Sequence, residues 1–298
     1  VGRPTDIQSL AWPRIAAGEH VLAAAPTGSG KTLTAFLAAL DALACGRWPV
    51  GQTSVVYVSP LKALGGDIRA NLSRPLSGLR QAFVAAGREF PRIRAELRTG
   101  DTPAEARRRM LRQPPEILIT TPESLNLLLS SKGGRGMLGA VRLVILDEVH
   151  AVAGSKRGVF LMAAVERLAL LAGEFQRVAL SATVSPLAEA ARFVGGLAPG
   201  PDDVLAPRPV AVVESRAVKA MDVRVEYPDW NAREGARDSF LAIVAGRIRR
   251  RIEANRTTLC FVNNRKLCEK LARLLNADRE TPLAHAHHGS LSKELRLA

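Results

Sequence analysis

Short apolar runs rich in β-branched residues recur along the first part of the chain and limit its fold more than any other feature. They are "VVYVS" (55–59), "EILIT" (116–120), "RLVILDE" (142–148) and "RVALS" (177–181). Their apolar residues are consecutive rather than alternating, which is typical of strands in a parallel sheet covered on both faces. Helical patterns such as "PAEARRRMLRQ" (103–113) separate them. This order predicts right-handed βαβ units and therefore an α/β fold on a doubly wound parallel sheet.

The stretch "APTGSGKT" (25–32) predicts a phosphate-binding loop, called the P-loop below. It follows the strand-like "HVLAAA" and opens the helical "TLTAFLAALDAL", so backbone N–H groups and a helix N-terminus converge on the phosphates. We expect Lys31 to reach the β- and γ-phosphates and Thr32 to ligate Mg²⁺. The strict pattern has glycine where this chain has Ala25, and the alternative is a glycine-rich turn without a ligand. The expected nucleotide-binding residues are Pro26, Thr27, Gly28, Ser29, Gly30, Lys31 and Thr32.

Two acidic residues follow directly on the apolar run "RLVIL". At the end of a strand near a P-loop, Asp147 can hold Mg²⁺, directly or through water, and Glu148 can activate the attacking water. The alternative is a strand-end turn with two solvated acids. Together with the P-loop, the pair predicts an NTPase site with Lys31, Asp147 and Glu148 as catalytic residues.

The charge balance favours a polyanionic partner. Lys and Arg number 42 against 28 Asp and Glu, a formal net charge of +14 at pH 7, which points to nucleic acid before a membrane surface. The alternative is that the arginines form a solvated surface. The three cysteines show no paired spacing, and the apolar helical run 33–44 is too short to cross a bilayer, so we expect a cytoplasmic, nucleoid-associated protein without a membrane partner.

The tetrapeptide "DEVH" (147–150) resembles the DExH box of superfamily 2 helicases, and other stretches resemble this family's motifs in the same order. "RPTDIQSLAWP" resembles the Q motif, "SPLKALGGDI" motif Ia, "SAT" motif III and "TLCFVNNRKLCEKL" motif IV; "RTGDTP" and "TTPESL" resemble the nucleic-acid-contacting loops, and "AHHGSLSKELR" the segment after motif IV. Longer stretches, including "YVSPLKAL" and "HHGSLSKELR", resemble the large helicase-related (Lhr-like) proteins. The ligase-associated DExH helicases are the close competitor.

The resemblance implies an ATP-dependent translocase and helicase, acting in DNA repair with 3′ to 5′ polarity. Two RecA-like domains would clamp ATP and move along single-stranded DNA or RNA, with DNA:RNA hybrids as a further candidate. Gln8 would read the adenine of ATP. His150 would be the fourth catalytic residue and, with Ser181, Ala182 and Thr183, would couple the nucleotide to the nucleic acid. The expected nucleic-acid contacts, mostly phosphate contacts that do not read bases, are Pro60, Lys62, Arg98, Thr99, Gly100, Thr121, Pro122, Glu123, Asn263, Arg265, His288 and Gly289.

The Gly-, Pro- and Asp-rich stretch 195–209 predicts a domain boundary. We expect a complete RecA-like domain over 1–198, a linker over 199–212 and the first part of a second RecA-like domain over 213–298, with strands "TLCFV" (258–262) and "LAHAH" (283–287). In the family, an arginine of motif VI stabilises the γ-phosphate, and no stretch of this sequence resembles that motif. We therefore expect little hydrolysis without the remainder of the protein's own chain, which would be a partner of these residues.

Other functions remain open on the residues alone. The same motor could remodel nucleoprotein without unwinding, a P-loop kinase would act on a small molecule, and a basic module with a degenerate nucleotide site would bind nucleic acid passively. The arginine runs 107–109 and 249–251 are more simply solvated helix faces, and the histidines of "AHAHHG" lack the companions of a zinc site. "SSKGGRGML" (130–138) is expected to be a surface loop.

Overall fold

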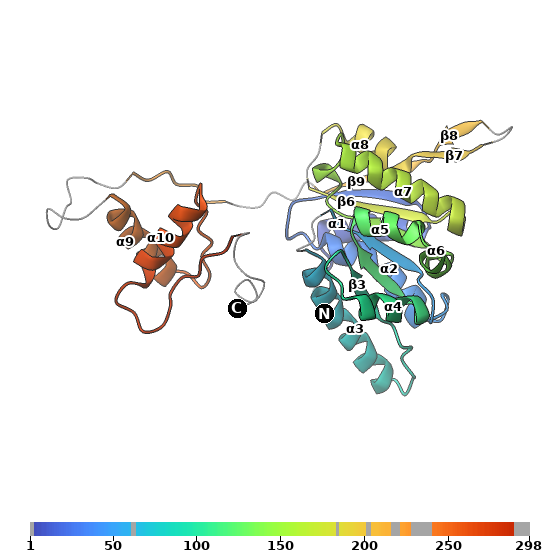
Figure 1. Cartoon of the computed structure of the whole chain (residues 1–298), viewed down its shortest axis with the longest axis horizontal. Coiled ribbons are helices and arrows are strands. Elements are labelled where there is room, and N and C mark those ends of the chain that lie inside the picture. Colours follow the sequence, from blue (N-terminus) through green and yellow to red (C-terminus); the bar gives the residue numbers. More distant parts are fainter. Residues whose placement is uncertain are drawn as a thin grey trace. The chain divides into compact units, whose positions relative to one another are not determined.

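The structure is a computed structural model that describes residues 3–60, 64–182, 185–200, 204–215, 221–227 and 240–288, with the backbone alone over 64–67. The chain divides into two compact units, Val1–Lys219 and Ala220–Ala298, and each is described by itself. Figure 1 shows the elements of both.

The first unit is built on a seven-stranded sheet in the order β3-β4-β2-β5-β6-β1-β9. Every neighbouring pair is parallel. The strands are β1 (His20–Ala24), β2 (Val55–Val58), β3 (Ala95–Arg98), β4 (Ile117–Thr120), β5 (Leu143–Leu146), β6 (Gln176–Ser181) and β9 (Val210–Glu214). Four of them fall on the apolar runs, so the predicted α/β fold with a parallel sheet is confirmed.

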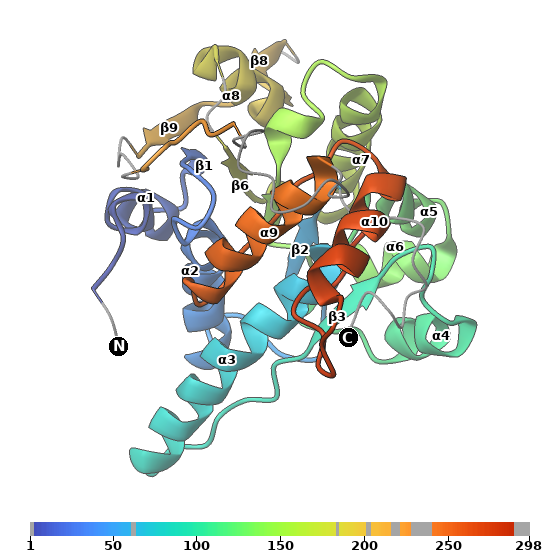
Figure 2. The same cartoon turned by 90° about the vertical axis from the view of Figure 1, so that its left-hand side faces the viewer.

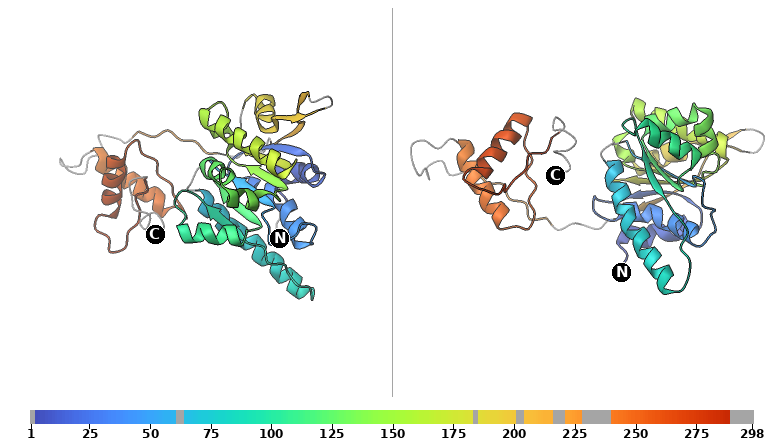
Figure 3. Two further views of the ribbon diagram at one scale, coloured as in Figure 1. Left: turned by 45° about the vertical axis from the view of Figure 1, so that its right-hand side comes forward. Right: turned by 60° about the horizontal axis from the view of Figure 1, so that its bottom comes forward.

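Helices cover both faces of the sheet (Figures 1 and 3). One layer holds α1 (Asp6–Ala16), α2 (Lys31–Ala44) and α3 (Leu64–Ala85), whose end projects past the sheet (Figure 2). The other holds α4 (Ala104–Arg112), α5 (Pro122–Leu129), α6 (Lys132–Leu138), α7 (Lys156–Ala172) and α8 (Leu187–Gly195). In β2, Val55 and Tyr57 face the first layer while Val56 and Val58 face the second. Since both faces are buried, apolar residues follow one another directly in these runs.

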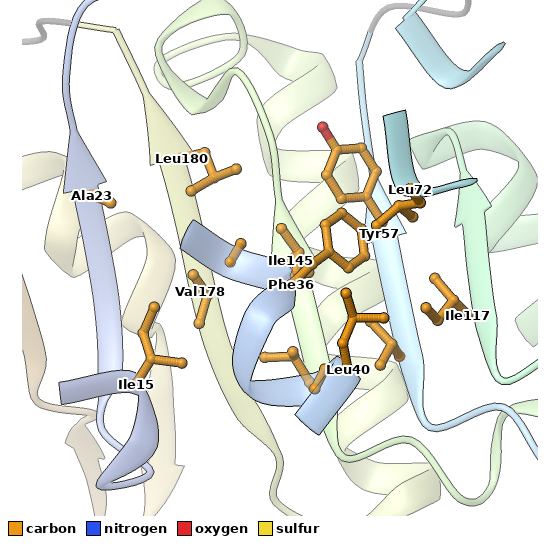
Figure 4. Packing of buried hydrophobic residues seen from close by; sticks show 14 of the residues in the cluster. Ile15, Ala23, Phe36, Leu40, Tyr57, Leu72, Ile117, Ile145, Val178 and Leu180 are labelled. Carbon is orange, nitrogen blue, oxygen red and sulfur yellow. The ribbon is translucent and has the colours of Figure 1, made fainter. Parts of the chain in front are cut away.

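Aromatic stacking fixes the first layer close to the middle of the sheet. The Phe36 ring of α2 lies against the Tyr57 ring of β2 with centroids 5.3 Å apart, and Leu40 and Ile145 pack beside them (Figure 4). Both aromatic residues are fully buried. This contact sets α2, and with it the P-loop that precedes it, against β2.

The stretch expected to link two domains lies within the first unit. The short strands β7 (Leu197–Pro199) and β8 (Leu205–Pro207) pair as antiparallel neighbours, and β9 pairs with β1 from His20↔Val210 to Ala24↔Glu214. The division between the units falls after Lys219 instead of within 199–212. The apolar residues after the proline-rich stretch find a strand edge to pair with, which the turn signals do not reveal.

The segment 130–138, expected as a loop, forms helix α6. The Ser131 hydroxyl accepts a hydrogen bond from the Gly134 N–H at 3.1 Å and caps the helix. A Cβ at Gly134 would lie 2.2 Å from the Leu128 carbonyl oxygen, so glycine permits close packing on α5. Met137 and Leu138 are buried, and the glycines therefore serve packing instead of loop flexibility.

The described part of the second unit contains α9 (Phe240–Glu253) and α10 (Arg265–Asn276), which pack through Ala245, Leu271 and Leu275. The strands expected over 258–262 and 283–287 are not formed there. Leu259 and Phe261 are 79% and 90% exposed, so no neighbouring strand covers them among the described residues. Near the second segment, the Asn276 side chain bonds the backbone of Leu283 and Ala284, which takes the place of a strand partner.

None of the described helices is both long enough and apolar enough to cross a membrane.

A buried arginine connects the amino-terminal end of β6 to helices α7 and α8. Arg177 is fully buried, and its guanidinium makes a two-pronged ion pair with Glu166 of α7 at 2.7 and 3.1 Å. It also donates to the carbonyls of Val194 and Gly195 at the end of α8. Arg208 joins the same cluster and pairs with Glu166 and Glu174.

Replacing Glu166 should test this cluster. Glu166→Gln leaves the Arg177 charge buried with carbonyls alone, and we expect a loss of about 3 kcal/mol in the free energy of unfolding. Urea unfolding followed by circular dichroism measures it. Glu189→Gln, which removes an exposed carboxylate from α8, is the control and should change stability by less than about 0.5 kcal/mol. Equal losses in both variants would contradict the assigned role.

Candidate functional site

The predicted motifs meet at the carboxyl-terminal ends of the strands. The P-loop follows β1, Ser181 ends β6 and Asp147 follows β5. These strands are direct neighbours in the order β5-β6-β1, so the three motifs lie side by side. Beyond β2, the 98–102 loop follows β3 and Thr121 follows β4. In open parallel sheets this edge is where ligands bind.

The P-loop has the backbone that its glycines predict. Gly28 and Gly30 have φ angles of +84° and +85°, and Gly30 is the N-cap residue directly before α2. Lys31 Nζ donates to the carbonyl oxygens of Ala25 at 2.6 Å and Pro26 at 2.9 Å. Burial lowers the pKa of Lys31, against the opposing effect of the nearby Glu148 and Asp147 carboxylates. The lysine thus lies inside the loop with two carboxylates close by.

Gln8 is held between α1 and the P-loop. Its Oε1 accepts from the Thr5 N–H at 3.0 Å, which closes the capping box of α1, and its Nε2 donates to the Gly30 carbonyl at 3.3 Å. A Cβ at Gly30 would lie 2.7 Å from Gln8 Nε2. Gly30 is therefore required both for its backbone angle and for the approach of Gln8. Adenine reading by Gln8 stays a prediction.

Asp147 is buried and hydrogen-bonded to a residue that the sequence does not single out. The Tyr57 hydroxyl of β2 donates to Asp147 Oδ2. Burial raises the pKa of Asp147, while the Tyr57 hydrogen bond opposes that rise. Burial and the Asp147 charge raise the pKa of Tyr57 well above its usual range. The tyrosine hydroxyl in "VVYVS" is the available signal, but its partner becomes clear only when Tyr57 is seen beside Ile145 in the β2–β5 register.

Glu148 adopts a backbone conformation that side chains with a Cβ rarely take. Its φ and ψ are 50° and 41°, in the left-handed region. Such strain persists at functional sites because the surrounding structure holds it. The turn ends β5 and begins the short helix η1 (Val149–Ala151). It directs the Glu148 and His150 side chains to within 3.3 Å of each other (Oε2 to Nδ1).

His150 joins the end of β5 to the end of β6. Its Nδ1 lies 3.2 Å from the Ala182 backbone nitrogen and 3.4 Å from Ser181 Oγ. Since a backbone N–H can only donate, His150 Nδ1 is the acceptor of this hydrogen bond. The predicted coupling residues Ser181 and Ala182 are thus in contact with the DEVH segment, and Thr183 lies outside the described residues.

The 98–102 loop is held by hydrogen bonds from its own threonines and from α4. The Thr99 N–H donates to Thr102 Oγ1 at 2.9 Å, and Thr120 Oγ1 donates to the Arg98 carbonyl at 2.9 Å. Burial, and next the charge of Arg107, lower the pKa of Arg98. Arg107 differs from the solvated face expected for 107–109, because its guanidinium bonds the carbonyls of Thr102 and Gly100.

The residues after β4 begin helix α5. The Thr121 hydroxyl accepts from the Ser124 N–H and caps the helix, and Pro122 is its first residue. Glu123 forms a two-pronged ion pair with Arg157 at 2.7 and 3.1 Å, and this hydrogen bonding lowers the pKa of the Glu123 carboxyl. The nucleic-acid contacts expected of Thr121, Pro122 and Glu123 stay predictions.

The other expected nucleic-acid residues are partly described. Pro60 is buried just after β2, whereas Lys62 and Gly289 lie outside the described residues. In the second unit, Arg265 is the first residue of α10 and Asn263 lies two residues before it. His288 Nε2 lies 2.8 Å from Glu269 Oε1 of α10.

Residues 5–191 match the family of DEAD/DEAH box helicases. The chain belongs to that family. It is 42% identical to the Lhr helicase/probable uracil glycosylase of Mycolicibacterium smegmatis, over 98% of this chain and 21% of that protein. It is 41% identical to the ATP-dependent helicase Lhr-Core protein 2 of Thermococcus barophilus, over 99% of this chain and 34% of that protein. The chain thus spans about a third or less of these relatives, and the predicted likeness to Lhr-like proteins is confirmed.

Solved DEAD/DEAH-type helicases share the fold. The Mycobacterium smegmatis helicase Lhr, solved with ssDNA and AMP-PNP, matches with a TM-score of 0.83 and 44% identity, over 99% of this chain and 37% of that one. The DEAD-box helicase Mss116, solved with ssRNA and UDP-BeF, matches with a TM-score of 0.71 and 18% identity, over 98% of this chain and 57% of that one. The second likeness bears on the fold alone.

The burial of Asp147 predicts a pH-dependent gain in stability on its removal. Because the folded state raises this pKa, the carboxyl favours folding while it is protonated, and that contribution is lost as the pH rises through the folded pKa. At neutral pH, Asp147→Asn should therefore stabilise the protein by on the order of 1 kcal/mol. The gain should shrink below the ordinary carboxyl pKa.

Urea unfolding at neutral and acidic pH measures this difference. Asp41→Asn, which alters an exposed carboxylate of α2, is the control. A destabilisation by Asp147→Asn at neutral pH that disappears at acidic pH would show instead that the ionised carboxylate stabilises the fold.

Proposed function

We propose that the chain is the motor part of an ATP-dependent helicase that moves on single strands of DNA or RNA. The observation that carries the proposal is the contact of His150 with Ala182. It connects the Asp147–Glu148 pair to the end of β6, which lies next to the P-loop strand. Hydrolysis can then be transmitted to the loops at the same edge of the sheet. The identity to Lhr helicases supports the same conclusion.

The P-loop residues fit the phosphates of ATP. The Lys31 ammonium lies at the N-terminus of α2, where partial positive charge attracts anions. The Ser29 hydroxyl oxygen is buried and has no hydrogen-bond partner among the described residues. A phosphate oxygen would satisfy it and would draw Lys31 Nζ away from the Ala25 and Pro26 carbonyls.

Thr32 and Asp147 are the residues that would hold Mg²⁺. The raised pKa of Asp147 reflects a buried carboxylate whose charge a cation would offset. When bound, Mg²⁺ neutralises charge on the β- and γ-phosphates. Tyr57 orients Asp147 by donating to its Oδ2 oxygen. Glu148, turned toward the same edge by its left-handed backbone, would accept the proton of the attacking water.

The nucleic acid would lie along the loops after β2, β3 and β4. Backbone N–H groups, hydroxyls and Arg98 suit phosphate oxygens, which makes binding independent of sequence. Action in DNA repair, DNA:RNA hybrids as partners, 3′ to 5′ polarity and a cytoplasmic, nucleoid-associated location remain predictions. So do the assignment of the second unit to a second RecA-like domain and the remodelling of nucleoprotein without unwinding.

Two substitutions in the full-length protein should separate nucleotide binding from hydrolysis. Lys31→Ala should abolish ATP binding or turnover, because the phosphates lose their main side-chain partner. Glu148→Gln should keep ATP binding while slowing hydrolysis by at least about 100-fold, because the general base is removed. ATP binding by calorimetry and single-strand-stimulated phosphate release measure the two steps. Lys132→Ala, an exposed change on α6, is the control; wild-type turnover by Glu148→Gln would refute the base assignment.

His150 should matter for coupling more than for nucleotide binding. His150→Ala removes the contacts with Ser181 and Ala182, so we expect single-strand stimulation of the ATPase to fall about tenfold while the ATP dissociation constant changes by less than about threefold. Stimulated and basal rates are measured across an oligonucleotide titration. An equal fall in both rates would place His150 in the chemical step instead.

A further inference from the structure

Arg107 differs from the arginines that follow it on α4. Its Nε donates to the Thr102 carbonyl at 2.7 Å, and its Nη2 donates to the Gly100 carbonyl and lies 3.5 Å from the Thr99 carbonyl. Arg108 and Arg109 are exposed, whereas Arg107 is half-buried. One guanidinium of the helix thus binds the backbone of a single turn at the end of β3.

The hydrogen bonds made by Arg107 determine the direction in which the Gly100 N–H of this turn points. In a trans peptide the C=O and the following N–H point in opposite directions. Since the Thr99 carbonyl faces Arg107, the Gly100 N–H is directed away from α4. Thr102 Oγ1 holds the same turn from within, because it accepts from the Thr99 N–H at 2.9 Å and donates to the Leu97 carbonyl at 3.2 Å.

The guanidinium is suited to this task by its shape. Its N–H groups form a planar, rigid fork that reaches two carbonyls at once, which a lysine ammonium on a flexible stem does not reproduce. The guanidinium N–H groups of Arg107 donate to the backbone carbonyls of Thr102 and Gly100, so the guanidinium is directed into the turn.

We propose that Arg107 is a positioning residue that holds the 98–102 loop in the conformation that binds the phosphates of a single strand. It orients the Gly100 amide and Arg98 without contacting the strand itself. The proposal rests on the proposed function, since it assumes that this loop faces nucleic acid.

Oligonucleotide binding by the full-length protein tests it. Fluorescence anisotropy with labelled dT20 at several salt concentrations compares the wild type with Arg107→Ala, Arg107→Lys and Arg108→Ala. We expect both Arg107 variants to bind dT20 about tenfold more weakly, because they lose hydrogen bonds that order the loop. The slope of the logarithm of affinity against the logarithm of salt concentration should stay unchanged, because no phosphate contact is lost. Arg108→Ala removes the same charge from the same helix and should bind within about twofold of the wild type.

Thr102→Val provides a second variant that changes no charge. It removes the hydroxyl that holds the turn from within, and it should also weaken dT20 binding at an unchanged salt slope. Circular dichroism confirms folding of each variant, and the ATP dissociation constant should stay within about twofold of the wild type. This readout separates loop positioning from general damage to the fold.

Three outcomes would overturn the proposal. Full rescue by Arg107→Lys, or a salt slope reduced by about 0.7 in Arg107→Ala, would make Arg107 a direct phosphate contact. Wild-type binding by both Thr102→Val and Arg107→Ala would show that the turn needs no support. A wild-type protein that binds no dT20 would instead refute the proposed function, on which this inference depends.

Discussion

Parallel pairing of β5, β6 and β1 is the constraint on which the rest of the site depends. Parallel strands end at the same edge of a sheet, so three segments far apart in the sequence are brought together without any contact of their own. The register pairs Leu146 with Ala179 and Ala24 with Ser181, so the three strands end close to one another at this edge. Single side chains can then bridge neighbouring strand ends, as Tyr57 does to Asp147 and His150 does to Ala182.

The polar groups at this edge of the sheet lower the stability of the fold, and ion pairs at the opposite end of the strands help to offset that loss. Asp147 is buried as a carboxylate, Lys31 is partly desolvated and Glu148 has a strained backbone. Each of these lowers stability unless a ligand is bound. At the amino-terminal end of the strands, Arg177 and Arg208 are paired with Glu166, and Arg208 also with Glu174. Stabilising ion pairs and the strained site thus occupy opposite ends of one sheet.

Much of this arrangement follows from the sequence, because it depends on local patterns. The apolar runs identify the central strands, and "GSGKT" before a helical pattern identifies the P-loop, since glycines and a lysine there have one common use. The segment 147–150 is found in the same way. The fold class and the backbone of the predicted P-loop are therefore legible in the amino-acid sequence itself.

What the sequence does not reveal are the contacts made across strands and between helices. Tyr57 reads as one more apolar strand residue until the β2–β5 register places it beside Asp147. Arg107 reads as one of three equivalent arginines until the end of β3 is seen against α4. In both cases the partner lies on another element, and side-chain type alone does not specify it. The strand β9 is hidden for the same reason, because only the free edge of β1 makes those residues a strand.

The residues that support the motifs share one property that bears on how the motor works. Gln8, Tyr57 and Arg107 each bind a backbone carbonyl or a side chain of a predicted site residue. They set the positions of Gly30, Asp147 and Gly100, which are the groups expected to meet phosphates or the metal ion that phosphates bind. Under the proposed function, the site binds two polyanions at one sheet edge, and its polar groups need to be fixed in advance because reorienting them during each cycle would weaken both interactions. The supporting residues are therefore as informative about the motor as the motifs that they hold.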